Sequence, residues 1–314
     1  MSEAARPVEA RGLVKRYGEI VAVDHVDLTV EAGDVFGYLG PNGAGKTTSL
    51  RMLLGLIRPT EGTVRLFGRD PLYDGARALD GVAGFVEGPR FYPYLSGRRN
   101  LRLLADFDGG AAESRIDEVL ELVDLRDRAK DRVGGYSHGM KQRLGIAAAL
   151  LRDPKLLLLD EPTTGLDPAG MRDMRDLVKR LAAQGITILL SSHILAEVEE
   201  LCDKVAIIRS GSIVYDGPLG DLLASAGGGF RLRASDNERA RVLLLQQRGI
   251  SSLALDDGYL RFQAEDGALE AATIALGRAG VGIAELVAQT SSLEELFLAM
   301  TGRESSDADR EAVA

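Results

Sequence analysis

Cysteine and histidine are scarce in this sequence. Cys202 is the single cysteine among 314 residues, so no disulfide forms within the chain, and a reducing compartment is expected. No His or Cys partner stands at ligand spacing from His138, which is therefore interpreted as no metal ligand. The chemistry has to be sought in other residue types.

Basic charge and long apolar runs are also lacking. The chain has 47 acidic and 38 basic residues, and its net charge of −9 disfavours nucleic-acid binding. No run approaches the ~18 apolar residues that span a bilayer. Residues 1–10 lack the apolar core of a signal peptide. Any work at a membrane is therefore expected to need a second chain that crosses it.

What the sequence does contain is a glycine-rich phosphate loop. Residues 40–48 read G-P-N-G-A-G-K-T-T and fit the pattern G-x-x-x-x-G-K-[ST]. An apolar run at 35–39 predicts a strand before the loop, and residues 50–54 predict a helix after it. An accidental glycine-rich turn is the alternative, and these flanks disfavour it. The predicted nucleotide ligands are Gly40, Pro41, Asn42, Gly43, Ala44, Gly45, Lys46, Thr47 and Thr48.

The residue types suit this chemistry. Glycines allow successive N–H groups to point into one concavity, and the start of the following helix adds partial positive charge. Lys46 is expected to reach the terminal phosphates, and the Thr47 hydroxyl is expected to bind Mg²⁺. The sequence therefore predicts a nucleoside triphosphate site.

Two carboxylates follow an apolar strand. Leucines at 156–159 are followed by Asp160 and Glu161, and an ordinary acidic strand end would not account for four consecutive leucines. At the carboxyl end of a buried parallel strand, Asp160 is placed to hold Mg²⁺. Glu161 is placed to take a proton from an attacking water.

Three further features have both a functional and a structural interpretation. His193 ends the strand predicted at 186–190 and is expected to face the γ-phosphate rather than play a structural role. Tyr17 either stacks on the nucleotide base or is a half-buried turn residue. The aromatic segment 88–95 is either a partner surface or a locally packed loop.

The order of predicted elements divides the chain. Alternating strands at 8–14 and 21–30 open it, and Ser137 is a candidate N-cap ahead of a helix at 144–151. The last third reads β-α-β-β-α-β, which favours a small α+β ferredoxin-like domain. The predicted segments are a loose N-terminus (1–7), a nucleotide-binding domain (8–219), a C-terminal accessory domain (220–302) and a disordered tail (303–314).

Taken together, these motifs resemble the ATP-binding subunit of an ABC transporter, and the drug- and bacitracin-resistance exporters in particular. The resemblance covers about residues 8–218. It equates residues 40–48 with Walker A, 156–161 with Walker B, 136–143 with the ABC signature, 165–168 (with Asp167) with the D-loop, His193 with the switch histidine, and Tyr17 with the base-stacking aromatic.

Two positions depart from the family pattern. His138 replaces the first glycine of the signature, whereas Ser137 and Gly139, which in the family reach the γ-phosphate across a dimer, are kept. Glu87 stands where the family usually has glutamine. A carboxylate there is expected to bind Mg²⁺ more strongly than an amide.

The resemblance implies an α/β fold, namely a P-loop NTPase domain with a mixed sheet and a helical subdomain. It implies that ATP and Mg²⁺ bind, with Lys46, Glu161 and His193 in catalysis and Thr47, Glu87 and Asp160 around the metal. Two copies would form a head-to-tail ATP sandwich on the cytoplasmic face of the cell membrane, joined to an integral membrane permease. The implied work is efflux of a drug, antibiotic or related amphiphile.

Other functions compete with this one. A soluble ABC ATPase of DNA repair or of the ribosome is disfavoured by the acidic charge, the single ATPase domain and the lack of a long coiled-coil insertion. An importer subunit is the alternative within transport. A regulatory module that senses ATP without hydrolysis is disfavoured by Glu161 and His193.

Overall fold

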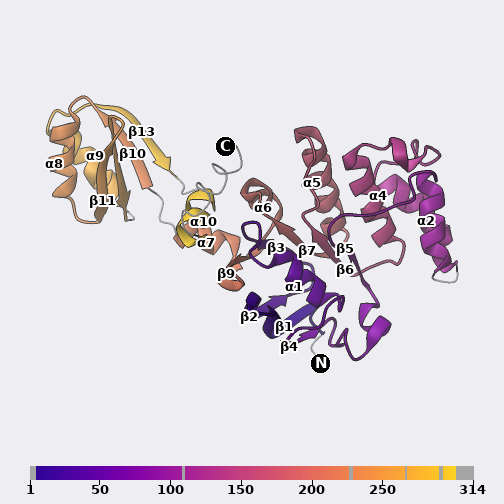
Figure 1. Ribbon diagram of the computed structural model, residues 1–314. Helices are drawn as coiled ribbons and strands as arrows, with labels where there is room; N and C mark the ends of the chain where they lie inside the picture. Colours follow the sequence, from indigo (N-terminus) through magenta and orange to yellow (C-terminus); the bar gives the residue numbers. More distant parts are fainter. Residues whose placement is uncertain (1–4, 108–109, 226–228, 266, 290–292, 302–314) are drawn as a thin grey trace, which may run out of the picture. The chain divides into compact units, whose positions relative to one another are not determined.

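The chain divides into two compact units, Met1–Leu219 and Gly220–Ala314 (Figure 1). The computed structural model describes residues 5–107, 110–225, 229–265, 267–289 and 293–301. The tail predicted at 303–314 lies outside these residues.

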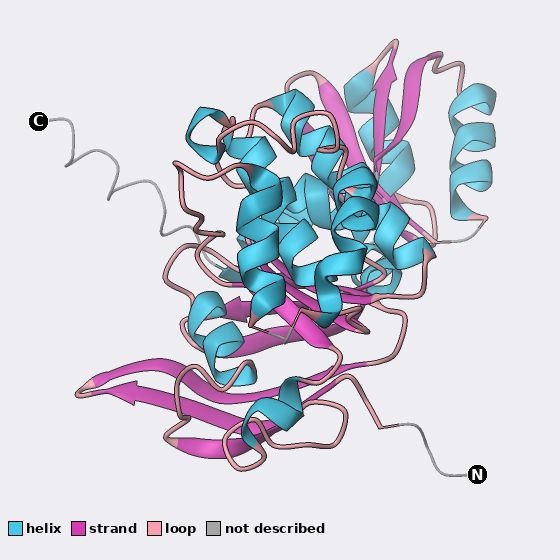
Figure 2. Cartoon of the chain, turned by 90° about the vertical axis from the view of Figure 1, so that its right-hand side faces the viewer, coloured by secondary structure: helices cyan, strands magenta, loops and turns pink. Residues whose placement is uncertain are grey.

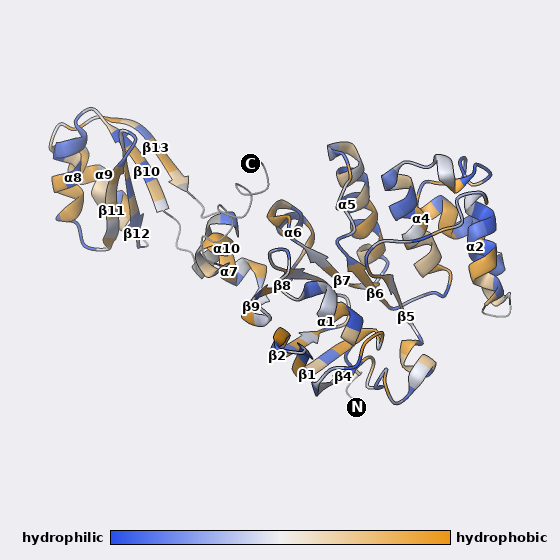
Figure 3. Cartoon of the chain, in the orientation of Figure 1, coloured by the Kyte–Doolittle hydropathy of each residue, from blue (hydrophilic) through white to orange (hydrophobic). Residues whose placement is uncertain are grey.

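The first unit is built on a six-stranded sheet in the order β5-β6-β7-β3-β8-β9. The first five of these strands run parallel, and β9 pairs antiparallel with β8. Every residue of β3 and β6 is buried, which accounts for the lack of apolar–polar alternation in β3 and in the four leucines of β6. Figure 3 shows the hydropathy of the elements. The strands are β3 (Val35–Leu39), β5 (Val82–Phe85), β6 (Leu156–Asp160), β7 (Thr187–Ser192), β8 (Lys204–Arg209) and β9 (Ser212–Pro218).

A three-stranded antiparallel sheet, in the order β2-β1-β4, forms a second layer of this unit. Its strands are β1 (Val8–Tyr17), β2 (Ile20–Val30) and β4 (Glu61–Arg65). Leu13, Leu28, Phe36 and Leu158 belong to one buried core that joins the two sheets. The strands predicted at 8–14 and 21–30 are confirmed, although β1 continues to Tyr17, for which a half-buried turn residue is one of the two alternatives.

Helices of the first unit pack against its sheets (Figure 2), and α2 and α4 lie on the β5 side of the central sheet (Figure 1). The segments α2, α3 and α4 pack on one another, and α4 also packs on β5, so they form the expected helical subdomain. The helices are α1 (Lys46–Leu53), α2 (Gly97–Asp106), α3 (Ile116–Leu122), α4 (His138–Leu150), α5 (Pro168–Ala183) and α6 (Leu195–Leu201). A further helix, α7, spans Leu219–Ser225, and short 3₁₀ turns cover Gly75–Leu79, Ala111–Arg115 and Val133–Gly135.

Several helices begin earlier than the sequence predicts. The helix expected to start at Leu144 starts at His138, because the Ser137 hydroxyl accepts a hydrogen bond from the Met140 N–H at 3.2 Å. Asp167 caps α5 in the same way, through the Gly170 N–H at 2.7 Å. Apolar periodicity identifies only the buried part of a helix, so it does not predict a first turn made of polar residues. The helices α6 and α7 were not predicted.

The second unit contains a four-stranded antiparallel sheet in the order β11-β12-β10-β13. With α8 (Asn237–Leu245) and α9 (Ala268–Arg278), it has the β-α-β-β-α-β order and strand arrangement of the predicted ferredoxin-like unit. Buried apolar side chains from both helices and from β10 and β12 form its core, including Leu232, Leu244, Leu260 and Leu276. The strands are β10 (Gly229–Ala234), β11 (Ile250–Asp256), β12 (Tyr259–Ala264) and β13 (Ile283–Gln289), and α10 (Leu293–Thr301) follows them.

Within the described part of the chain, no helix combines the length and the apolar content that crossing a membrane requires.

Gly84 provides a test of the β5–β6 pairing. A Cβ at this position would lie 1.9 Å from the Leu158 carbonyl oxygen on the neighbouring strand. We expect Gly84→Ala to lower the free energy of unfolding by about 3 kcal/mol, because the strands must separate to admit the methyl group. Urea unfolding measures this. The matched control is Gly135→Ala, where a Cβ meets no atom within 4 Å; equal stability of the two variants would contradict the close pairing.

Candidate nucleotide-binding and catalytic site

The predicted site residues meet at one edge of the central sheet. In the parallel register, Asp160 at the end of β6 pairs with Ser191 of β7, and Leu39 at the end of β3 pairs with Ser192. The chain segments that leave these three strands therefore emerge side by side. They are the phosphate loop, the Asp160–Glu161 pair and the turn that carries His193.

The phosphate loop is closely packed at two of its glycines. A Cβ at Gly40 would lie 2.6 Å from the Ile208 carbonyl oxygen, and one at Gly45 would lie 2.5 Å from the Ala22 carbonyl oxygen. Gly45 also has a φ of 109°, which side chains disfavour. Because α1 begins at Lys46 and has no acidic residue in its first turn, its free N–H groups are available to an anion.

Lys46 is a buried cation with three oxygen partners. Its Nζ donates to the carbonyl oxygens of Gly40 (2.8 Å) and Pro41 (3.1 Å). It also lies 3.2 Å from Glu161 Oε1. A buried ammonium needs such partners, since the charged form is otherwise costly to desolvate. The phosphate loop thus holds one positive charge directly against the candidate base.

Glu161 is held from both sides. Its Oε2 accepts a hydrogen bond from Thr164 Oγ1 at 2.9 Å and lies 3.2 Å from His193 Nδ1. Burial alone would raise the pKa of Glu161, but the Thr164 hydrogen bond, Lys46 and His193 outweigh it and leave the pKa below its ordinary value. Glu161 is therefore ionised at neutral pH, as a proton acceptor must be.

Asp160 is buried and has partners on both oxygens. Oδ1 accepts from Ser191 Oγ at 2.6 Å, whereas Oδ2 accepts from Thr47 Oγ1 at 2.9 Å. The Glu87 N–H also approaches Oδ2, at 3.4 Å. The hydroxyl and the carboxylate that were predicted to share a metal ion are thus adjacent.

Glu87 lies close to this group, but its carboxylate is paired elsewhere. It forms an ion pair with Arg51 of α1, and its side chain is about half exposed. Its φ of 62° lies in the left-handed region, and its N–H approaches Asp160 Oδ2. The structure thus places the backbone of Glu87, rather than its carboxylate, on Asp160.

A cavity of about 400 Å³ connects these residues. Its oxygen donors suit a hard cation such as Mg²⁺, which typically takes one or two carboxylates plus phosphate oxygens. Gln142 adds a buried Oε1 that has no hydrogen-bond partner among the described residues. Within the same described residues, no group of three His, Cys, Asp or Glu side chains forms a complete cage. The lining residues are Thr47, Glu87, Gly88, His138, Gln142, Asp160, Glu161, Thr164 and Gly165.

The signature residues border a second cavity, of about 390 Å³. Ser137, Gly139 and Asp167 line it, with Ser137 and Asp167 occupied as helix caps. His138 borders both cavities, and its ring lies 3.5 Å from where a Gly165 Cβ would be. The histidine thus fills the space between the signature turn and the D-loop.

Tyr17 lies apart from this cluster, at the end of β1. Its ring is about half exposed, and Lys15 Nζ lies 5.1 Å from the ring centre. An exposed face is compatible with base stacking, which stays a prediction.

Sequence reasoning missed four residues that contact the predicted ones or line the same cavity. Arg51 had a usable signal, because it stands four residues after Thr47 and so shares its helix face. Gln142, Thr164 and Ser191 had none, since a lone polar residue does not reveal which neighbour it will contact.

The comparisons with known proteins agree with the motifs. The family described as ABC transporter matches residues 23–164. The bacitracin transport ATP-binding protein BcrA of Bacillus licheniformis is 41% identical over 297 residues, covering 94% of this chain and 97% of that protein. The daunorubicin/doxorubicin resistance ATP-binding protein DrrA of Streptomyces peucetius is 38% identical, covering 100% and 98%.

A solved structure agrees as well. The ATP-binding cassette MJ0796, a dimer bound to ADP and Pi in a post-hydrolysis state, superposes with a TM-score of 0.61. It is 25% identical and covers 68% of this chain and 98% of that chain. The predicted family and fold class are confirmed: the chain belongs to the ATP-binding subunits of ABC transporters, which are ATPases.

Proposed function

We propose that this chain hydrolyses ATP at the edge of β3, β6 and β7 and thereby powers an exporter whose membrane-spanning part is a separate permease. The observation that supports this most is the contact of one ionised carboxylate, Glu161, with both Lys46 and His193. Glu161, the proposed base, thus lies 3.2 Å from each of the two proposed phosphate-binding groups.

In the proposed reaction, Lys46 and the N–H groups at the start of α1 bind the phosphates of ATP. The γ-phosphate takes the place of the Glu161 carboxylate on Lys46 and His193, which frees Glu161 to accept a proton from water. His193 then steadies the γ-phosphate while charge moves onto it. Positioning and charge neutralisation supply most of the rate enhancement.

We assign Mg²⁺ to Thr47 and Asp160, with Glu87 as a further ligand once it leaves Arg51. When bound, the ion neutralises charge on the phosphate oxygens. The chain's own contribution is to keep Asp160 Oδ2 beside the Thr47 hydroxyl, where the two now lie 2.9 Å apart.

We further propose that two copies close head to tail, with Ser137 and Gly139 of one copy reaching the γ-phosphate held by the other. The dimeric cassette MJ0796 supports this by likeness. Asp167, which borders the same cavity as Ser137, would then lie at the dimer interface. Residues 8–219 would supply all of these contacts, and residues 220–302 would be an accessory domain.

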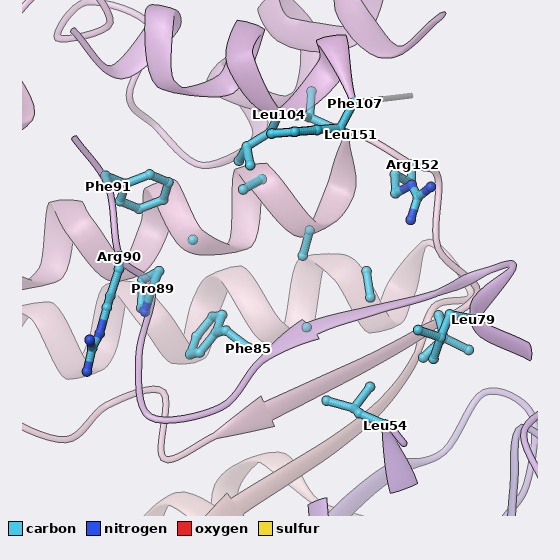
Figure 4. Close-up of a pocket in the computed structure, with 16 residues that line it drawn as sticks. Leu54, Leu79, Phe85, Pro89, Arg90, Phe91, Leu104, Phe107, Leu151 and Arg152 are labelled. Carbon is cyan, nitrogen blue, oxygen red and sulfur yellow. The ribbon is translucent and has the colours of Figure 1, made fainter. Parts of the chain in front are cut away.

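A groove beside β5 is proposed as the permease-binding surface. Its cavity of about 460 Å³ is lined by apolar side chains from β5, the 89–91 segment and α2, with Arg90 and Arg152 at its sides (Figure 4). Phe107 and Leu104 are exposed large apolar residues of this groove. Such a patch next to a nucleotide site is typical of a protein-binding surface.

The names of the relatives support a substrate class. BcrA is named for bacitracin transport and DrrA for daunorubicin and doxorubicin resistance. We therefore propose efflux of an antibiotic or a similar amphiphile, with the chain at the cytoplasmic face of the membrane.

The first test removes the phosphate-binding cation. Lys46→Ala should lower ATP turnover at least about 100-fold, because the charge that neutralises the γ-phosphate is lost. A phosphate-release assay on the purified chain measures this. Lys179→Ala, which removes a lysine paired with Glu200 on the surface, is the control and should turn over normally. Near-normal hydrolysis by Lys46→Ala would refute the phosphate-loop assignment.

The second test removes the base. Glu161→Gln should bind ATP but hydrolyse it about 1,000-fold more slowly, because the amide accepts no proton. With hydrolysis blocked, the ATP-bound protein should accumulate as a dimer in size-exclusion chromatography. Glu118→Gln on the surface of α3 is the control. A Glu161→Gln protein that stays active and monomeric would count against both the base and the sandwich.

The third test concerns the groove. Phe107→Asp should abolish recovery of the membrane-spanning partner from detergent-solubilised membranes, because a carboxylate enters an apolar contact surface, while ATP turnover of the isolated chain stays unchanged. Tyr73→Asp changes a comparably exposed aromatic residue that does not line the groove. The parent and Tyr73→Asp should both recover the partner. If Phe107→Asp recovers it as well, the permease binds at another surface.

A further inference from the structure

Ser191 lies between the two residues that bear the site carboxylates. It is fully buried next to the end of β7, opposite Asp160 in the parallel register. Its Oγ donates to Asp160 Oδ1 at 2.6 Å and accepts from the Glu161 N–H at 3.0 Å. The Glu161 N–H can only donate, so Ser191 Oγ accepts that bond and gives its single hydrogen to the Asp160 carboxylate.

The bond to Asp160 decides which carboxylate oxygen is free for other work. With Oδ1 bound to Ser191, the opposite oxygen, Oδ2, faces Thr47 and the cavity. Rotation of the carboxylate would break a buried, charge-assisted hydrogen bond, which is among the stronger kinds. Ser191 therefore limits Asp160 to the orientation in which its free oxygen lies beside the Thr47 hydroxyl.

The bond to Glu161 acts on its backbone. Glu161 has a φ of 47°, in the left-handed region that residues other than glycine seldom adopt. Its N–H is directed at Ser191, toward Oγ at 3.0 Å and the carbonyl oxygen at 3.2 Å. This turn directs the Glu161 side chain toward Lys46 and His193.

We propose that Ser191 is a positioning residue of the ATPase reaction. It orients Asp160 for Mg²⁺ and Glu161 for water through a single hydroxyl, so both carboxylates depend on it. This inference rests on the proposed function, because it assumes that the two carboxylates serve metal binding and proton transfer.

A purely structural hydroxyl would behave differently, and the same strand offers one. Thr187, at the other end of β7, is equally buried, and its Oγ1 accepts a hydrogen bond from the Gly33 N–H at 2.9 Å. It touches no site residue in the described structure. Thr187→Val therefore removes a buried hydroxyl from β7 without touching either carboxylate.

The experiment compares Ser191→Ala and Thr187→Val with the parent protein, in the full chain. The first readout is the affinity for ATP in EDTA and in excess Mg²⁺, measured by fluorescence titration. The second is steady-state turnover as a function of Mg²⁺ concentration, and thermal unfolding serves as the stability reference. Ser191→Cys is a second loss variant, because a thiol fills the site but is a weak donor. Ser191→Thr, which keeps the hydroxyl, tests for rescue.

We expect Ser191→Ala and Ser191→Cys to bind ATP like the parent in EDTA. Both should lose most of the gain in affinity that Mg²⁺ confers, and their kcat should fall about 10- to 100-fold, the range typical of residues that orient metal ligands. Thr187→Val should lose about as much thermal stability as Ser191→Ala, but its gain in ATP affinity from Mg²⁺ and its kcat should match those of the parent. Ser191→Thr should recover most of the Mg²⁺-dependent affinity and most of kcat.

Parent-like Mg²⁺ dependence and kcat in Ser191→Ala or Ser191→Cys would overturn the proposal. An equal loss of Mg²⁺ dependence and kcat in Thr187→Val would also overturn it, because any buried hydroxyl of β7 would then have the same effect as Ser191. If the parent protein itself failed to hydrolyse ATP, the proposed function would fall. The Mg²⁺-dependent binding comparison would still decide the role of Ser191 toward Asp160.

Discussion

The cluster of Lys46, Glu161 and His193 is the constraint on which the rest of the site depends. Lys46 is buried, and a buried cation left without a partner destabilises a protein by about 3–5 kcal/mol. In the structure that partner is Glu161, together with two carbonyl oxygens of the phosphate loop. Under the proposed function, an incoming γ-phosphate would offer negative charge to the same two groups, Lys46 and His193. The Glu161 carboxylate would then stand where phosphate oxygens bind.

The central sheet makes this cluster possible. Lys46 follows β3, Glu161 follows β6 and His193 follows β7, so 147 residues of sequence separate the first from the last. Parallel strands in the order β6-β7-β3 bring their carboxyl ends to one edge, which is where ligands bind in open α/β sheets. All residues of β3 and β6 are buried, and the parallel pairing of each with β7 aligns those ends.

The sequence predicts most of this arrangement, and the exceptions have one cause. The phosphate loop, Asp160, Glu161 and His193 could be located because each stands at a fixed offset from a recognisable strand. The roles of Ser191 and Thr164 could not, since a serine or threonine is common, and its partner is set by packing between strands distant in sequence. The predicted Ser137 N-cap is confirmed, but the sequence predicts the helix from residue 144, where apolar periodicity begins, whereas α4 starts at His138 directly after the cap. Local sequence patterns predict helices and strands, whereas side-chain contacts between distant elements can be identified only in the folded structure.

The two departures from the family pattern meet in one place, since Glu87 and His138 both line the cavity that contains Asp160. A glutamate in place of the usual glutamine adds a third negative charge to a cavity that already contains Asp160 and Glu161. Without a nearby cation, repulsion among the three carboxylates would make their charged forms less stable. Arg51 offsets it, and it stands one helical turn beyond Thr47 on α1. A divalent cation held by Thr47 and Asp160 would then compete with Arg51 for the Glu87 carboxylate. The Glu87 N–H lies 3.4 Å from Asp160 Oδ2, so this residue contacts the aspartate through its backbone while its side chain pairs with Arg51. The added acidic charge is thus offset by a neighbouring cation.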